Sequence, residues 1–196
     1  SIFLFIFHIY LSADDIDYSE QYESSAAFDE AYDCLQQTFV VYYDGMHKCA
    51  KEALEISESF ENPDPKKIAM ITAKYGLSLS KKSVPEKERG LKELTRASDL
   101  VERAFGSDSC EMASVLFELA SQKSSKKTLL DSAFSDFEKS LSICVIEKNT
   151  QYASKIRDFV KSLELETLNK EQLATAKSFS IQAYDIYKNF KGPSFK

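Results

Sequence analysis

The side chains with the greatest capacity for chemistry in this chain of 196 residues are four cysteines and two histidines. The cysteines lack the short CxxC spacings that bind zinc, and the only histidines are His8 and His47. A cysteine nucleophile served by His47 would need a third group to orient the base, and no residue of the sequence is predicted to supply one. The sequence therefore predicts no enzyme, no catalytic residue, no metal site and no cofactor. A small hydrolase-like enzyme is kept as a third alternative.

The cysteines leave two interpretations open. In an oxidising compartment they can pair, and helix geometry helps to choose the partners. If the helices that carry Cys110 and Cys144 meet at a serine-rich turn, the two residues differ by about 6 Å in height, which one helical turn absorbs. Cys34 and Cys49 differ more in height along the helices, if these meet at the turn expected at Asp44–Gly45. Four small buried thiols are the first interpretation. The alternative is a disulfide, for which this geometry favours the pair Cys110 and Cys144.

The overall composition excludes several other classes of site. Five glycines, widely separated, exclude a glycine-rich loop that cradles phosphates. A net charge of −6 argues against nucleic acid as the main partner. Charge is also polarised: residues 14–62 hold 13 acidic and 2 basic side chains, whereas residues 63–196 hold 18 and 23. This polarity predicts steering of a partner or head-to-tail contact between copies, the alternative being a merely solvated acidic hairpin.

The first residues, Ser1–Ala13, form an almost unbroken apolar run. The run is shorter than the roughly 20 residues that a membrane-spanning helix needs, but it fits the apolar core and cleavage region of a signal peptide. We interpret it as a signal-peptide remnant, followed by an acidic linker over residues 14–18, and expect a periplasmic or secreted protein. The alternatives are a buried segment or a membrane anchor. A membrane is a partner only if Ser1–Ala13 is retained.

Beyond the linker, apolar residues recur at three- and four-residue steps, which is the periodicity of α-helices. Turn and capping residues interrupt this pattern and divide it into eight segments. The expected helices are near residues 19–43, 46–61, 66–82, 87–105, 109–123, 127–147, 149–163 and 169–190. The sequence therefore predicts an all-α domain over residues 19–190, with a basic tail over residues 191–196.

The helices also repeat in pairs. In the second helix of each pair, a small residue precedes an aliphatic residue by three positions: Ala53 and Ile56, Ala97 and Leu100, Ser140 and Ile143, Ala183 and Ile186. Alanines open the first helices at a similar period: Ala26, Ala69, Ala113 and Ala153. A small residue lets a neighbouring helix approach closely, so a period of about 43 residues predicts stacked helical hairpins that share one core. The alternative is an irregular helical bundle.

The stretch from Ala97 through the Phe105-Gly106-x-Asp108 linker to Leu119-Ala120 resembles the tetratricopeptide repeat (TPR) family. The likeness is to its long-helix variety, as in the kinesin light chain, and covers roughly residues 19–190. It implies a right-handed solenoid of about four stacked hairpins. It also implies that the first helix of each hairpin lines a concave groove in which a peptide binds.

The family's register assigns the groove to nine positions, in three triplets. They are Ala73, Lys74 and Leu77, then Phe117, Glu118 and Ser121, then Arg157, Asp158 and Lys161. We expect a peptide held by Phe117, with Arg157 and Lys161 near its acidic groups. The predicted function is a non-enzymatic, exported scaffold that binds protein or peptide. The alternative is a structural subunit of a cell-envelope assembly, a homo-oligomer that stacks through its charged ends.

Overall fold

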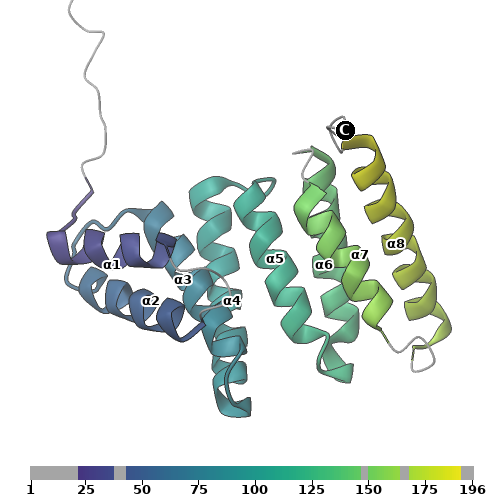
Figure 1. Ribbon diagram of the computed structural model, residues 1–196, viewed down its shortest axis with the longest axis horizontal. Helices are drawn as coiled ribbons and strands as arrows, with labels where there is room; N and C mark the ends of the chain where they lie inside the picture. The colour runs from purple at the N-terminus through teal and green to yellow at the C-terminus, as the bar shows by residue number, and fades with distance from the viewer. Residues whose placement is uncertain (1–21, 38–42, 147–149, 164–167, 191–196) are drawn as a thin grey trace, which may run out of the picture.

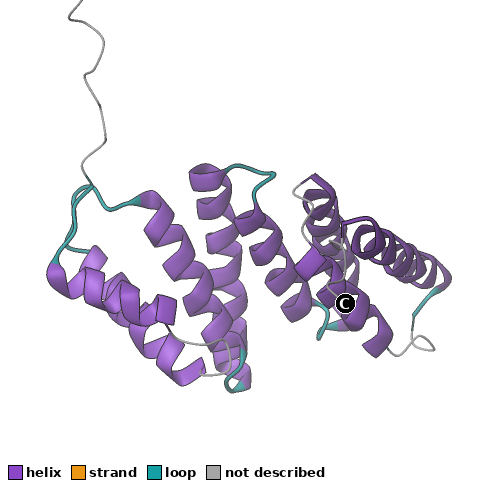
Figure 2. Cartoon of the chain, turned by 45° about the horizontal axis from the view of Figure 1, so that its top comes forward, coloured by secondary structure: helices purple, strands orange, loops and turns teal. Residues whose placement is uncertain are grey.

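The computed structural model describes residues 22–37, 43–146, 150–163 and 168–190, and over these residues the protein is all-α, as Figure 2 shows. Within them the only extended pairing is an isolated bridge between Glu23 and Pro63. No helix in the described ranges combines the length and apolarity that crossing a bilayer requires. The predicted signal remnant at Ser1–Ala13, the linker over residues 14–18 and the tail over residues 191–196 lie outside the described residues.

Eight α-helices occupy the described chain, and their existence and order were predicted from the periodicity. Their bounds are α1 Ala26–Gln37, α2 Tyr43–Ser57, α3 Pro65–Ser80, α4 Val84–Phe105, α5 Cys110–Lys123, α6 Leu130–Ile146, α7 Thr150–Ser162 and α8 Lys170–Phe190. A short 3₁₀ turn, Lys127–Leu129, leads into α6.

Local chemistry explains where several helices begin and end. The Asp64 carboxylate accepts a hydrogen bond from the backbone N–H of Lys66 at 2.9 Å, and so caps α3. The Ser109 hydroxyl caps α5 in the same way, accepting from the N–H of Met112 at 3.1 Å. Gly106, with a φ of 94°, ends α4 in a conformation that other residues rarely adopt. The expected break at Asp44–Gly45 is wrong, because both residues lie in the first turn of α2.

Figure 1 shows the helices following one another along the molecule, from α1 and α2 at one end to α8 at the other. Each helix packs against the next, and the most extensive contact joins α3 to α4. The odd-numbered helices also touch in succession, since α1 contacts α3, α3 contacts α5 and α5 contacts α7. This pairwise packing places the predicted groove positions on three helices that lie side by side.

The apolar residues form two cores rather than one. The first contains the buried side chains of α1 and α2, with Ile71, Tyr75 and Leu79 of α3. The second begins with Ala69 and Ala73 on the same helix and continues through α4 to α8. Helix α3 therefore belongs to both cores and joins them.

Most of the small residues of the predicted repeat lie in helix contacts. Ala53, Ala97, Ser140 and Ala183, the four positions of the second helices, all have 0% exposure. Ser140 also donates its hydroxyl to the Ala113 carbonyl across the contact of α5 with α6, at 2.9 Å. In the first helices Ala69, Ala113 and Ala153 are buried too, but Ala26 is exposed. The first hairpin therefore departs from the repeat.

The closest helix contact depends on two glycines. A Cβ added to Gly90 of α4 would lie 2.8 Å from the Gly76 carbonyl oxygen of α3. A Cβ on Gly76 would in turn lie 2.9 Å from the backbone nitrogen of Leu94. Because backbone atoms cannot rotate away, these two positions let α3 and α4 approach more closely than any side chain allows.

A disulfide joins Cys34 to Cys49, whose Cα atoms are 6.0 Å apart, so the interpretation of four buried thiols is wrong. The bond also does not join Cys110 to Cys144, the pair that the sequence favoured. The geometric reason lies in the first turn. Cys34 lies three residues before the end of α1 and Cys49 lies six residues after the start of α2, so the two cysteines are nearly level. Cys110 and Cys144 are both thiols. Burial, together with a smaller contribution from the nearby Cys110, raises the pKa of Cys144 to about 11.

Candidate functional site

The predicted groove positions of α3 are engaged in packing. Ala73 is only 9% exposed, and Leu77 packs against the first core. The Lys74 ammonium donates a hydrogen bond to the Leu35 carbonyl at 3.2 Å, which ties α3 to α1, and burial lowers the pKa of this lysine. At this end, the groove positions stabilise the fold and offer little free surface.

The positions on α5 are more accessible. Phe117 is half-buried, with its ring centroid 5.8 Å from that of Phe137 in the second core. The Ser121 hydroxyl donates to the Phe117 carbonyl of its own helix at 2.8 Å. Glu118 is also half-buried, on the next position of the same turn. The α5 segment therefore supplies one aromatic ring and one carboxyl group to this face.

On α7 the three predicted residues are linked to one another. Arg157 donates to the Asp158 carboxylate at 3.0 Å and to the Ser154 hydroxyl at 3.2 Å. The ammonium of Lys161 lies 3.9 Å from the same carboxylate, with two thirds of its side chain exposed. An acidic group on a ligand would therefore meet Lys161 first and would compete with Asp158 for Arg157.

Two lysines that the sequence reasoning missed complete the cluster. The Lys155 ammonium of α7 lies 5.5 Å from the Phe117 ring centroid, a cation–π contact between α7 and α5. The charges of Lys155 and of Lys81, just after α3, both act on Glu118. The triplet register overlooked Lys155, although Lys155 and Asp158 are three residues apart on one helical turn. Lys81 gave no signal beyond marking the end of a helix.

The electrostatics of Glu118 follow from these neighbours. Burial raises the pKa of this carboxyl group, while the positive charges of Lys81 and Lys155 partly oppose the rise. The central cluster, which we define as Lys81, Phe117, Glu118 and Lys155, thus joins α3, α5 and α7. It combines an aromatic face with two ammonium groups whose charges act on one carboxyl group.

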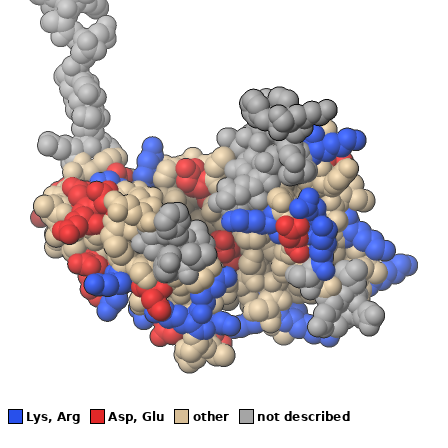
Figure 3. Space-filling model, in the orientation of Figure 1, with Lys and Arg blue, Asp and Glu red and all other residues tan. Residues whose placement is uncertain are grey.

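Charge is unequal over the molecule, as the sequence indicated. Figure 3 shows acidic side chains gathered over the end formed by α1 and α2, and basic side chains prominent over the α7 and α8 side of this face. At the acidic end, Asp29 of α1 is paired with Lys67 of α3 at 3.1 Å. The hydroxyl of Ser24 and this lysine lower the pKa of Asp29. The first hairpin is therefore held to α3 through charge as well as apolar contact.

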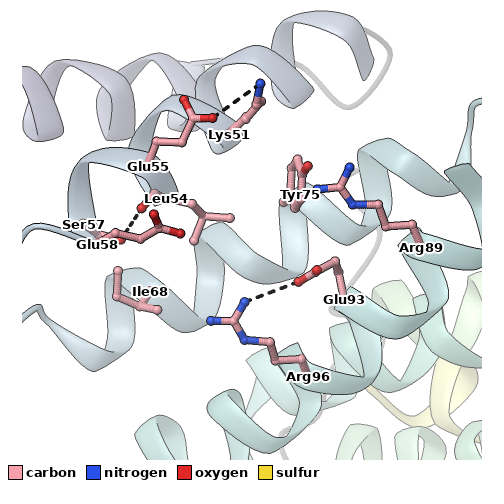
Figure 4. Close-up of a pocket in the computed structure, with 10 residues that line it drawn as sticks. All are labelled: Lys51, Leu54, Glu55, Ser57, Glu58, Ile68, Tyr75, Arg89, Glu93 and Arg96. Atoms are coloured by element: carbon pink, nitrogen blue, oxygen red, sulfur yellow. Dashed lines mark hydrogen bonds and ion pairs between the residues drawn. The ribbon is translucent and has the colours of Figure 1, made fainter.

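A pocket of about 220 Å³ lies outside the predicted groove, between α2 and α4. Figure 4 shows Glu55 and Glu58 on the α2 side, Arg89 and Arg96 on the α4 side, and Tyr75 of α3 between them. The Arg89 guanidinium carbon lies 5.6 Å from the centroid of the Tyr75 ring. The pocket therefore has an aromatic floor and walls of opposite charge.

One carboxylate oxygen at this pocket is poorly satisfied. Glu93 Oε2 is buried and makes no hydrogen bond in the structure, although an Arg96 nitrogen lies 3.5 Å away. Sequence reasoning did not find this pocket. The only available signal was the spacing of Arg89, Glu93 and Arg96, which places them along one face of α4.

Among the described residues, the nearest approach to a nucleophile–base pair is His47 Nδ1, 3.3 Å from the Ser78 hydroxyl oxygen. That hydroxyl donates its proton to the Tyr75 carbonyl at 2.6 Å, and Ser78 is completely buried. The His47 ring also stacks on Tyr75, with centroids 5.2 Å apart, and burial lowers its pKa. These contacts identify His47 as a packing residue between α2 and α3.

No group of three or more His, Cys, Asp or Glu residues in the described chain is arranged to hold a metal ion. Comparisons with known protein families, with curated proteins and with solved structures gave no significant match to this chain.

Proposed function

We propose that this chain is a non-enzymatic, TPR-like scaffold that binds a peptide or protein segment across the first helices of its hairpins, α3, α5 and α7. The observation that carries the proposal is the central cluster. In it the Lys155 ammonium of α7 lies over the Phe117 ring of α5, and the charges of Lys155 and of Lys81, just after α3, act on Glu118. The burial of all four small residues of the second helices supports a stacked-hairpin repeat. The right-handed solenoid is part of the same proposal.

The chemistry of the surface favours an acidic ligand with an apolar side chain. Lys161 is largely exposed and lies near the Asp158 carboxylate, toward which Arg157 is also held. Lys155 lies over Phe117. An extended or helical segment would place its apolar group against Phe117 and its carboxylates near Arg157 and Lys161. The Asp158 carboxylate would lose its contacts as the ligand's acidic group takes them.

Export to an oxidising compartment belongs to the same proposal. The disulfide between Cys34 and Cys49 supports it, because such bonds persist outside reducing cytosol. The apolar run Ser1–Ala13, interpreted as a signal-peptide remnant, points in the same direction. The intact mass of the protein recovered from fractionated cells tests this part. A mass starting near Asp14 in a periplasmic or secreted fraction supports it, whereas a cytosolic fraction retaining Ser1–Ala13 contradicts it.

Peptide binding is tested by fluorescence anisotropy. The probe is a fluorescein-labelled peptide in which Phe and Leu alternate with Glu, compared with the same peptide carrying Lys in place of Glu. We expect the Glu peptide to bind and the Lys peptide not to bind. The double substitution Arg157→Glu and Lys161→Glu should weaken binding by about tenfold or more, equivalent to about 1.4 kcal/mol.

The matched control changes two lysines outside the proposed surface. Lys92 of α4 and Lys127 of the 3₁₀ turn are exposed, and replacing both by Glu gives the same change in net charge. This control should bind like the wild type, and both double variants should keep their helical circular dichroism. Equal weakening by the two double variants would show that net charge, rather than this surface, governs binding, and would contradict the proposal.

A further inference from the structure

The outward face of α8 carries an exposed apolar patch. Ile181 is 64% exposed and Tyr184 is 54% exposed, three residues apart on the side opposite the buried Ala176, Phe179 and Ala183. Large apolar side chains are usually exposed singly, so an adjacent aliphatic and aromatic pair indicates a contact surface. Both residues lie at the end of the molecule farthest from α1 and α2 (Figure 1).

Basic residues flank this patch along the helix. Lys177 precedes Ile181 by four residues, and Lys188 follows Tyr184 by four, so all four residues fall on one face. Lys177 and Lys188 are exposed, and Asp185 is the acidic residue adjoining the patch. We call Lys177, Ile181, Tyr184 and Lys188 the α8 stripe. It presents an apolar centre between two positive charges.

The opposite end of the molecule has a hollow and carries an excess of the opposite charge. A hollow of about 320 Å³ lies between α1 and α2, with Ala27, Ala31 and the disulfide supplying its apolar lining. Glu30 and Glu52 contribute exposed carboxylates, and Lys48 one ammonium group. Its volume falls at the lower end of the roughly 300–1,000 Å³ of pockets that enclose small molecules, which is sufficient for an aromatic side chain.

We propose that a second copy of this chain inserts the Ile181 and Tyr184 side chains of its α8 stripe into the hollow between α1 and α2. Lys177 and Lys188 of one copy then lie near Glu30 and Glu52 of the next. The acidic excess of residues 14–62 against the basic excess of the remainder favours this orientation over two like ends meeting. The inference is independent of the peptide-binding proposal, because it uses none of the central cluster.

The geometry has a definite consequence for assembly. The two complementary surfaces lie at opposite ends of one chain, so the contact is heterologous and leaves one free surface of each kind on every dimer. Further copies therefore add in the same direction. Association should produce a series of species of increasing length and should weaken with salt, because its flanking charges are exposed.

Two blocked variants test this arrangement by analytical ultracentrifugation of the full chain. The tail variant carries Ile181→Glu and Tyr184→Glu, and the head variant carries Glu30→Lys and Glu52→Lys. All four positions are exposed, so both variants should keep the wild-type circular dichroism. The wild type should give a mass that rises with concentration beyond a dimer, whereas each variant alone should remain monomeric.

The mixture of the two variants is the decisive sample. The head of the tail variant and the tail of the head variant are both intact, so an equimolar mixture should form heterodimers and nothing larger. A mixture that stays monomeric would overturn the proposal. A wild type that is monomeric at every concentration would also overturn it, and would indicate that a different partner covers α8. If the tail variant fails to associate while the head variant still associates, the contact joins two α8 helices, and the proposal is overturned.

A matched control separates charge from position. Asp99→Lys and Glu138→Lys change two exposed acidic residues of α4 and α6 and should leave assembly as in the wild type. Arg157→Glu with Lys161→Glu should also leave assembly unchanged while weakening peptide binding. Failure of the assembly experiment is therefore distinguishable from failure of the peptide experiment.

Discussion

The first hairpin, α1 with α2, and the last, α7 with α8, are stabilised in different ways. In the last hairpin, Ala153 and Ala183 are both completely buried, as the repeat predicts. In the first, Ala53 is buried but Ala26 is exposed, and a disulfide joins the two helices. The comparison shows that a covalent bond and a charge contact to α3 stabilise the hairpin that conforms least to the predicted repeat.

Matched truncations in the two cores should have the largest effects and should show whether the cores unfold together. Phe137 in the second core and Phe28 in the first are both almost inaccessible to solvent. Each Phe→Ala substitution should lower the free energy of unfolding by about 4 kcal/mol, through lost burial and a cavity. Urea denaturation measures the loss.

Hydrogen exchange locates the same two effects. We expect Phe28→Ala to reduce protection mainly in α1 and α2, and Phe137→Ala to reduce it from α5 to α8. Equal loss of protection throughout the chain in both variants would show that α3 couples the cores into one cooperative unit, and would remove the distinction between the regions.

Breaking the disulfide should have the next largest effect, confined to the first hairpin. The bonded residues are separated by 15 positions, a loop for which closure entropy gives about 3 kcal/mol. Cys34→Ser with Cys49→Ser should therefore lower the thermal midpoint and loosen α1 and α2. The control is Cys110→Ser, which removes a thiol that forms no disulfide. Unchanged stability in the double variant would show that apolar contacts alone hold this hairpin.

The contact between α3 and α4, where the two cores meet, should be destabilised by a single added methyl group. Gly90→Ala places a Cβ about 2.8 Å from backbone atoms of α3, so the helices must separate, at an expected cost of about 2 kcal/mol. Gly106→Ala is the matched comparison, because it meets open space but has a φ of 94°. Its cost should come from backbone strain alone, about 1 kcal/mol. A smaller effect at Gly90 than at Gly106 would contradict the close approach of α3 and α4.

Titration should give the smallest effects, with opposite signs in the two regions. Burial raises the pKa of Glu118 above its ordinary value of 4.5, so the folded state holds this proton more tightly than the unfolded state does. Its contribution to stability is full below the unfolded pKa and is lost as pH rises through the folded pKa. Glu118→Gln should remove that decline in urea denaturation measured above pH 4.5.

Asp29 should behave in the opposite way. The Ser24 hydroxyl and Lys67 lower its pKa below the ordinary value of 3.8, so its contribution is present above the unfolded pKa and is lost as pH falls through the folded pKa. Asp29→Asn should therefore flatten the acid side of the same stability profile. Identical pH profiles for the wild type and both variants would show that neither carboxyl group is perturbed.

The sequence predicted the helices and their order because periodicity, caps and small residues act locally. Helices were expected to start near residues 66 and 109, and the side chains of Asp64 and Ser109 accept backbone hydrogen bonds at those two starts. Gly45 misled the assignment of the first turn, because glycine marks breaks but is also tolerated at the start of a helix. One misplaced turn was sufficient to favour the wrong pair of cysteines for a possible disulfide.

The candidate site was less predictable for a different physical reason. The register placed Phe117 and Glu118 on the expected helix, but it could not show that Lys74 would be used by the Leu35 carbonyl. Nor could it show that Lys81 and Lys155, 74 positions apart, act on the same carboxyl group. Such contacts depend on how successive hairpins are rotated against each other, which no local pattern encodes.

The bond between Cys34 and Cys49 also determines how the molecule would respond to tension. A chain pulled from its two ends lengthens by about 3.3–3.6 Å for each residue released from structure. The 15-residue span closed by the disulfide is removed from that extension, which withholds about 50 Å of contour length. Under load, the disulfide would prevent extension of the segment between Cys34 and Cys49, whereas the remaining helices could unfold and extend fully.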